Sequence, residues 1–403
     1  MRSLLLTPTS VCVAILLVAP CQAADEKLQI DADFPGGNII VDEVKGDDVY
    51  LHQDLRDTAG DWFYWYFRVY GGQGRSLTFH FTKGNPIGVR GPAVSTDGGK
   101  SWKWLGAEAV RAATFTYAFP KDVEEVRFCF AFPYQGHNLR AFLKGHEKSP
   151  HLKVESLCKT KKDRDVELLL LGRLDGKSEH RVALTCRHHC CEMMASYVLE
   201  GIITEVLADS DDGKWLRQHV EFFIVPMVDK DGVEDGDQGK NRKPRDHNRD
   251  YEGKSIHASV KAIRERLPEW SAGKLRFAMD MHCPAIRGGT NESVYFVGGP
   301  DEEIWREVNG FCKTLEETQR GSVVYRSKNN LTFGQGWNSK ANYTSGKPFA
   351  HWAAELPGVL AATTIEVAYA NAEGKPVTDE SARALGRDIA RSMRKYLQAN
   401  TSK

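Results

Sequence analysis

Short hydrophobic segments of strand type follow one another through the first third of the chain. Aromatic and β-branched residues dominate them, and turn signals such as Gly36-Gly37 and Gly71-Gly72 separate them. Five such segments cover residues 38–41, 61–70, 76–82, 113–119 and 126–132. Several short strands at such intervals are typical of an all-β sandwich. We therefore predict an N-terminal β-sandwich domain over residues 24–150.

The pattern changes near residue 150, where apolar runs begin to alternate with longer amphipathic segments. The apolar runs predict buried strands at 167–171, 182–185, 222–225, 277–279, 294–297 and 364–367. The amphipathic segments predict helices at 193–207, 256–267, 302–318 and 381–397. This alternation favours an α/β/α domain with a mixed central sheet over residues 151–403. A linker over 145–153 is expected between the two domains.

Residues 1–23 have the features of an export signal. Arg2 gives a basic start, residues 11–19 form a short apolar run, and small side chains stand at the cleavage positions Cys21 and Ala23. The run is shorter than the roughly 20 residues that cross a membrane, and no later stretch is long and apolar enough. We predict a periplasmic or secreted protein without a membrane span. An uncleaved anchor or a buried helix is the alternative.

The composition excludes two other classes of protein. The 403 residues hold 54 Lys and Arg against 54 Asp and Glu, which argues against a nucleic-acid partner. Hydrophobic residues at 41% and aromatic residues at 10% exclude a disordered chain. Seven of the nine cysteines follow the signal, so at least one is expected to be a free thiol or to pair with another chain.

Two residues of metal-ligand type lie between the strand at 182–185 and the helix at 193–207. His189 and Glu192 are three residues apart, so on a helical turn both side chains point to one side and can hold zinc. Chance alone gives on the order of one such spacing in a chain of this size, so a structural role is the alternative. His188 points off that face and is expected to pack or support.

His282 is the candidate third ligand, because a catalytic zinc site uses three protein ligands and water. It follows a predicted strand, and ligands gather at the carboxyl ends of strands in open α/β sheets. Asp280 could steady its imidazole. Glu366 lies in an apolar strand, where a carboxylate is costly unless it is paired or functional, so it is a candidate general base or a buried ion pair.

A long polar segment over residues 229–249 separates these motifs. Its acidic, glycine-rich start slightly resembles a calcium loop, but no glutamate stands where an EF-hand requires its bidentate ligand. Its basic second half is either a solvated face or a guanidinium fork for a carboxylate.

These motifs together resemble a zinc metallocarboxypeptidase of the carboxypeptidase A type. His189, Glu192 and His282 resemble the zinc triad of that family, residues 246–249 resemble its D-L-N-R motif, and residues 364–367 resemble the strand of its catalytic glutamate. The N-terminal β region is similar to the extra domain of the cytosolic carboxypeptidase branch, which removes glutamates from polyglutamylated proteins.

The resemblance implies one zinc per chain and a role for each matching residue. Asn248 and Arg249 would bind the terminal carboxylate of the substrate, and Glu366 would be the general base. Lys240 would polarise the scissile carbonyl where the family has an arginine, and Tyr343 would be its mobile tyrosine. Arg242 and Arg245 are the rivals of Lys240 for that role.

We therefore predict a zinc-dependent carboxypeptidase that removes C-terminal residues, with glutamate as one candidate, from peptides or protein tails. One alternative is a zinc amidohydrolase of the same fold that acts on acyl-amino acids or peptidoglycan peptides. Another is a glycan- or peptide-binding protein with a degenerate site. The residue that sets specificity, the disulfide pairing and the oligomeric state stay open. The candidates for specificity are Lys347, His351 and Arg326.

Overall fold

The N-terminal part of the chain builds two five-stranded sheets, in the orders β1-β4-β10-β6-β7 and β2-β3-β5-β9-β8. The computed structural model describes residues 27–400, so the predicted signal lies outside the described residues. The strands are β1 (Gln29–Asp31), β2 (Ile40–Lys45), β3 (Asp48–His52), β4 (Tyr66–Tyr70), β5 (Ser76–Phe81), β6 (Ala93–Ser95), β7 (Lys103–Trp104), β8 (Val110–Arg111), β9 (Thr114–Ala118) and β10 (Glu125–Cys129).

Aromatic side chains join the two sheets. Phe67 on β4 and Phe128 on β10 belong to one sheet, and their ring centres lie 5.5 and 5.3 Å from that of Phe79 on β5 of the other. All three side chains are fully buried. Buried aromatic pairs at this separation contribute strongly to a core, so the two sheets pack face to face through these rings.

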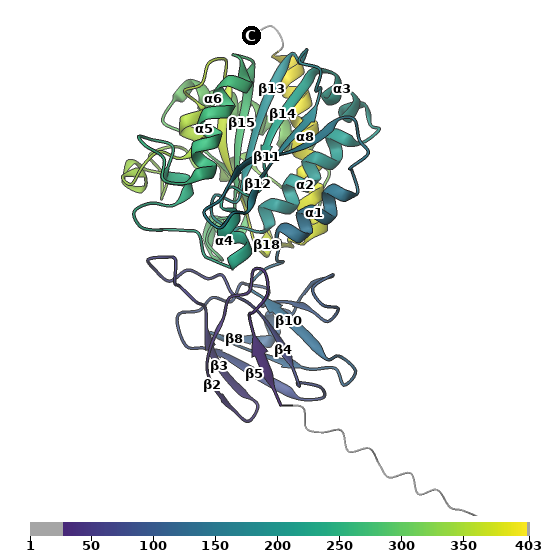
Figure 1. Ribbon diagram of the computed structural model, residues 1–403, viewed down its shortest axis with the longest axis vertical. Coiled ribbons are helices and arrows are strands. Elements are labelled where there is room, and N and C mark those ends of the chain that lie inside the picture. Colours follow the sequence, from purple (N-terminus) through teal and green to yellow (C-terminus); the bar gives the residue numbers. More distant parts are fainter. Residues whose placement is uncertain (1–26, 401–403) are drawn as a thin grey trace, which may run out of the picture.

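The larger part of the chain forms a seven-stranded mixed sheet in the order β11-β12-β14-β13-β15-β17-β16 (Figure 1). The four strands β14, β13, β15 and β17 run parallel, and antiparallel strands form both edges. The strands are β11 (Leu152–Lys159), β12 (Asp165–Gly172), β13 (His180–Cys186), β14 (Val220–Val225), β15 (Leu275–His282), β16 (Val294–Val297) and β17 (Ala361–Val367), with a small hairpin of β18 (Asn371–Ala372) and β19 (Lys375–Pro376).

Helices lie on both sides of this sheet, which explains why its central strands are buried over nearly their whole length (Figure 1). The α-helices are α1 (Gly136–Lys144), α2 (Met194–Leu207), α3 (Asp211–His219), α4 (Lys230–Asp235), α5 (Ala258–Ser271), α6 (Glu302–Thr318), α7 (Phe349–Ala353) and α8 (Asp379–Ala399). Short 3-10 helices are η1 (Ala107–Ala109), η2 (His247–Arg249), η3 (Gly289–Glu292), η4 (Ser327–Asn329) and η5 (Lys340–Tyr343).

The structure differs from the sequence-based predictions at several places. The strand predicted over 61–70 begins only at Tyr66, because both backbone polar groups of Tyr64 bond to the side chain of Gln238 instead of to a strand. The polar segment contains the short helix α4, which Asp229 caps by accepting from the Gly232 amide at 3.1 Å. The helices α1 and α3 and the edge strand β11 were not predicted.

The seven cysteines of the described residues are all free thiols, and six of them are buried. Their burial agrees with the use of cysteine as a small hydrophobic side chain. Within residues 27–400, no helix combines the length and the apolar character that a membrane crossing requires.

Candidate active site

Three adjacent parallel strands, β13, β15 and β17, bring the predicted site residues together at the carboxyl ends of the strands. His282 is the last residue of β15, and its register partner on β17 is Glu366. The turn that carries His189 and Glu192 directly follows β13, the neighbour of β15 on its other side. Since the carboxyl ends of parallel strands lie on the same side of the sheet, residues far apart in the sequence meet there.

The predicted metal ligands converge at these strand ends. The Nδ1 atom of His282 lies 2.6 Å from Glu192 Oε2 and 3.2 Å from the Nδ1 atom of His189. The Nδ1 atom of His189 is 3.0 Å from Glu192 Oε1. These three side chains form one of two groups, among the described residues, whose ligand atoms all lie within 4.8 Å of one another. Two imidazoles and a carboxylate are a donor set that suits catalytic zinc.

His189 and Glu192 were expected on the first turn of a helix, but α2 begins only at Met194. A turn closed by the Glu192 amide and the His189 carbonyl, 3.3 Å apart, turns the two side chains the same way instead. Glu192 is fully buried, which would favour its neutral form, but Lys240 and the two histidines hold the pKa of its carboxyl well below the usual value. It is therefore a carboxylate, as a metal ligand must be.

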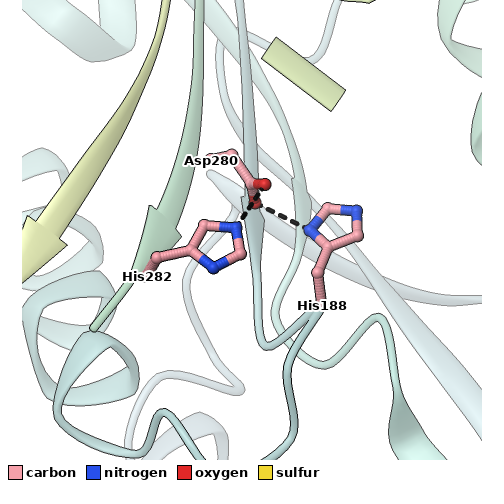
Figure 2. Close-up of side chains that lie close together, drawn as sticks. All are labelled: His188, Asp280 and His282. Atoms are coloured by element: carbon pink, nitrogen blue, oxygen red, sulfur yellow. Dashed lines mark hydrogen bonds and ion pairs between the residues drawn. The ribbon is translucent and has the colours of Figure 1, made fainter. Parts of the chain in front are cut away.

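His282 also belongs to a second group of polar side chains, which it forms with His188 and Asp280 (Figure 2). Asp280 binds the Nε2 atom of His282 at 2.6 Å through one oxygen and the Nδ1 atom of His188 at 2.7 Å through the other. The Nε2 atom of His188 meets the Tyr251 hydroxyl at 2.7 Å, and Thr185 donates to Asp280 at 2.8 Å. Every ligand atom of this second group already has a hydrogen-bond partner. Because Asp280 bonds to the Nε2 atom of His282, the Nδ1 atom of that ring faces His189 and Glu192 and is available to a metal.

Glu366 faces the same space with an oxygen that has no partner. Its side chain is 7% exposed, and its Oε2 atom bonds to no group of the described residues. Burial, together with the nearby charge of Glu192, raises the pKa of Glu366 to about 7. Tyr295 lies opposite on the antiparallel strand β16, and its buried hydroxyl is likewise without a partner. Two buried orphan polar groups at one place indicate a site for a ligand or water.

Of the three basic candidates in the polar segment, only Lys240 faces this space. Its ammonium lies 2.6 Å from Glu192 Oε1. Burial alone would lower the pKa of Lys240, but Glu192 raises it above the usual value. Arg242 instead pairs with the three carboxylates Asp57, Asp229 and Asp237, and Arg245 pairs with Asp250 at 2.6 Å.

The residues predicted to bind the terminal carboxylate, Asn248 and Arg249, line the same cavity as the predicted metal ligands. The Nε and Nη1 atoms of Arg249 donate to backbone carbonyls of Asn342 and Asn248, and no described residue forms an ion pair with it. The Asn248 amide nitrogen is 3.1 Å from His282 Nε2. The Tyr343 ring lies 4.9 Å from the Arg249 guanidinium, and its hydroxyl donates to Asn338.

All eight predicted site residues line one cavity of about 380 Å³. Of the three candidates for specificity, only His351 lines it, while Lys347 pairs with Glu355 at 2.6 Å. The sequence analysis missed several lining residues: Trp62, Asn291, Tyr295 and Trp337. Trp62 is the least expected of them, because it comes from the N-terminal part. Its position next to Phe63 and Tyr64 reads as core, and no local signal marks it as a cavity residue.

Comparisons with known proteins agree with this geometry. The zinc carboxypeptidase family matches residues 139–277. Cytosolic carboxypeptidase 3 of Bos taurus is 28% identical over 233 residues, which are 54% of this chain and 22% of that protein. An uncharacterized protein of Zymomonas mobilis is 27% identical over 266 residues, which are 63% of this chain and 67% of that protein. The chain thus spans less than a quarter of the cytosolic carboxypeptidase.

Solved structures share the fold over nearly the whole chain. A metallo-carboxypeptidase from Burkholderia cenocepacia has a TM-score of 0.76 at 21% identity and covers 93% of this chain and 99% of its own. A metallo-carboxypeptidase from Pseudomonas aeruginosa, in complex with (2-guanidinoethylmercapto)succinic acid, has a TM-score of 0.72 at 19% identity, with 93% and 100% covered.

The chain therefore resembles the zinc metallocarboxypeptidases, and His189, Glu192 and His282 form its candidate metal site. The relatives named above include a cytosolic carboxypeptidase, and the two solved structures named above are bacterial metallo-carboxypeptidases.

Proposed function

We propose that this protein is a carboxypeptidase that hydrolyses the last peptide bond of peptides or protein tails. The observation that carries the proposal is a single cavity in which three metal-ligand side chains, the unpartnered carboxylate of Glu366 and the guanidinium of Arg249 meet. A zinc ligand set, a base and a carboxylate clamp are the parts that this reaction requires.

One zinc ion per chain would be held by the Nδ1 atoms of His189 and His282 and by the carboxylate of Glu192. These atoms lie 2.6 to 3.2 Å from one another, close enough for one ion to bind all of them. Bonds to that ion would replace the present contacts between the three side chains. Zinc, when bound, acts as a Lewis acid on the scissile carbonyl and on the attacking water. Asp280 fixes the ring of His282 from the other side.

Glu366 would accept the proton of the attacking water and return it to the leaving amine. Its raised pKa suits both steps, because a group that titrates near neutral pH can take up and release a proton with little cost. The ammonium of Lys240 would stabilise the negative charge that develops on the carbonyl oxygen. Its present partner, Glu192, would be engaged by the metal.

Arg249 would bind the free carboxylate of the substrate, with Asn248 beside it. Support comes from the position of Arg249 in the cavity and from the absence, among the described residues, of a carboxylate that pairs with it. A guanidinium offers two parallel N–H groups that match two carboxylate oxygens. Tyr343, which packs on Arg249, would cover the bound terminal residue.

Glutamate remains one candidate for the residue removed, supported by the likeness to cytosolic carboxypeptidases. His351 would contact its side chain. Burial, reinforced by the charge of Arg249, lowers the pKa of His351 to about 4, so it would do so as a neutral hydrogen-bonding group. Export to the periplasm or medium is a further proposal, supported only by the signal-like features of residues 1–23. We also infer that the two packed sheets form the predicted all-β sandwich domain.

The experiment that tests this function is mass spectrometry of a peptide library that varies at its last residue, with and without a chelator. The proposal predicts loss of single C-terminal residues, abolished by the chelator and restored by zinc. Cleavage of acyl-amino acids but not of peptides would favour an amidohydrolase, and zinc binding without any hydrolysis would favour a binding protein.

A further inference from the structure

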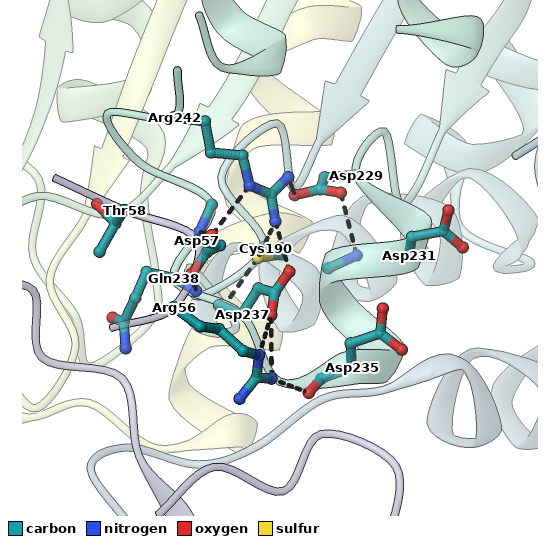
Figure 3. Close-up of polar contacts among 12 residues, drawn as sticks. Arg56, Asp57, Thr58, Cys190, Asp229, Asp231, Asp235, Asp237, Gln238 and Arg242 are labelled. Carbon is teal, nitrogen blue, oxygen red and sulfur yellow. Dashed lines mark hydrogen bonds and ion pairs between the residues drawn. The ribbon is translucent and has the colours of Figure 1, made fainter. Parts of the chain in front are cut away.

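The N-terminal part of the chain holds the loop that carries Lys240 (Figure 3). One oxygen of Asp57 accepts the backbone amide of Gln238 at 3.0 Å, and the other accepts the amide of Gly239 at 2.8 Å. The second oxygen also pairs with Arg242 Nε at 2.9 Å. A carboxylate that accepts two amides and a guanidinium makes strong charge-assisted bonds, so Asp57 fixes the backbone just before Lys240.

Further contacts from the N-terminal part act on Gln238 and Lys240 of this loop. Thr58 donates its hydroxyl to the Lys240 carbonyl at 2.5 Å, and the Gln238 amide group bonds to both backbone polar groups of Tyr64 at 2.8 and 2.9 Å. The ammonium of Lys240 lies 4.8 Å from the centre of the Trp62 ring, within the range of a cation–π contact.

The opposite side of the loop rests on the turn of the metal ligands. Gly239 has φ +79°, and a Cβ at this position would lie 2.4 Å from the backbone nitrogen of Cys190, the residue after His189. The loop backbone is thus enclosed between the metal-ligand turn and the N-terminal part. Arg242 completes the enclosure, because it also pairs with Asp229 and Asp237 of the larger part.

We propose that Asp57 is a positioning residue of the active site, which acts through Lys240. The Lys240 side chain has four rotatable bonds, so its ammonium is placed only as well as its backbone is held. This inference rests on the proposed function of Lys240. If Asp57 positions Lys240, the N-terminal part is a component of the active site. It supplies Trp62 to the wall of the cavity and Asp57 to hold the Lys240 loop.

The test compares Asp57→Asn with Asp31→Asn in the zinc-loaded full chain. Asp31 pairs with Arg68 within the N-terminal part at 3.0 and 3.2 Å and serves as the matched control. Asp57→Asn should speed hydrogen exchange at the amides of Gln238 and Gly239 and lower kcat about 10- to 100-fold, with zinc content unchanged. The control should leave this exchange and kcat at wild-type values.

A double-mutant cycle separates positioning from a general structural effect. In a Lys240→Ala enzyme, Asp57→Asn should cause no further loss of kcat, because the group it positions is absent. An undiminished loss in that background, or unchanged exchange or kcat in Asp57→Asn alone, would overturn the proposal. Normal kcat in Lys240→Ala would instead refute the proposed role of Lys240 itself, and this would be evident without any Asp57 variant.

Discussion

Glu366 is a buried carboxylate near the carboxyl end of β17, and its surroundings define what it can do. One oxygen is buried without a partner, and no basic side chain of the described residues forms an ion pair with it. Burying a carboxylate without a partner normally lowers the stability of a fold, so such a group is typical of a functional site. Among the described residues, Glu366 therefore does not form the buried structural ion pair that was the alternative.

Replacing Glu366 by glutamine should keep the fold and the bound zinc but remove most turnover. An amide cannot accept the proton of water at neutral pH, and general-base catalysis is worth about 100- to 10,000-fold. The measurement is kcat on a good peptide substrate, with metal content determined in the same samples. Near-normal kcat in a folded, zinc-loaded variant would exclude Glu366 as the base.

The pH dependence of kcat/KM should carry the signature of the same group. The base is active when deprotonated, and burial and Glu192 raise the pKa of Glu366 to about 7. Bound zinc would oppose this rise, so kcat/KM should be constant above pH 7 and should fall at a pH below 7, where Glu366 takes up a proton. Activity that increases on acidification from pH 7 to pH 5 would contradict this assignment.

At the scale of elements, the ends of β13, β15 and β17 create the candidate metal site. The strands are predictable because they are buried on both faces and so read as apolar runs, and their shared edge explains why His189, His282 and Glu366 meet. The helix α4 was not predicted because it is short and polar, and the edge strand β11 was not predicted because only one of its eight residues is buried, so it forms no apolar run. Trp62 could not be assigned to the cavity, because its environment is created by the other part of the chain.

Removing His282 should abolish zinc binding, because two protein ligands remain where a catalytic site needs three. Metal analysis of His282→Ala after dialysis should show zinc falling from about one equivalent to a small fraction. His351→Ala is the matched control, since His351 lines the same cavity but lies outside the ligand group, and it should retain zinc. An unchanged zinc content in His282→Ala would reject the ligand set.

At the scale of the whole molecule, the cavity is a joint product of the two parts. The larger part supplies the candidate metal ligands, the candidate base Glu366 and Arg249, and the N-terminal part supplies Trp62 and the contacts on the Lys240 loop. The likeness to bacterial metallo-carboxypeptidase structures likewise extends over both parts. Truncation to the larger part would therefore remove a wall of the cavity.

The carboxylate clamp decides between a carboxypeptidase and another amidase, so its test addresses the central claim. A matched pair of peptides that differ only in a free or an amidated C-terminus is incubated with the wild-type enzyme and with Arg249→Lys. The account predicts that the wild type cleaves the free peptide and not the amide. It also predicts that Arg249→Lys weakens kcat/KM on the free peptide by about 1.5–3 kcal/mol, the range of a hydrogen bond to a charged group. Equal cleavage of both peptides by the wild type would contradict it.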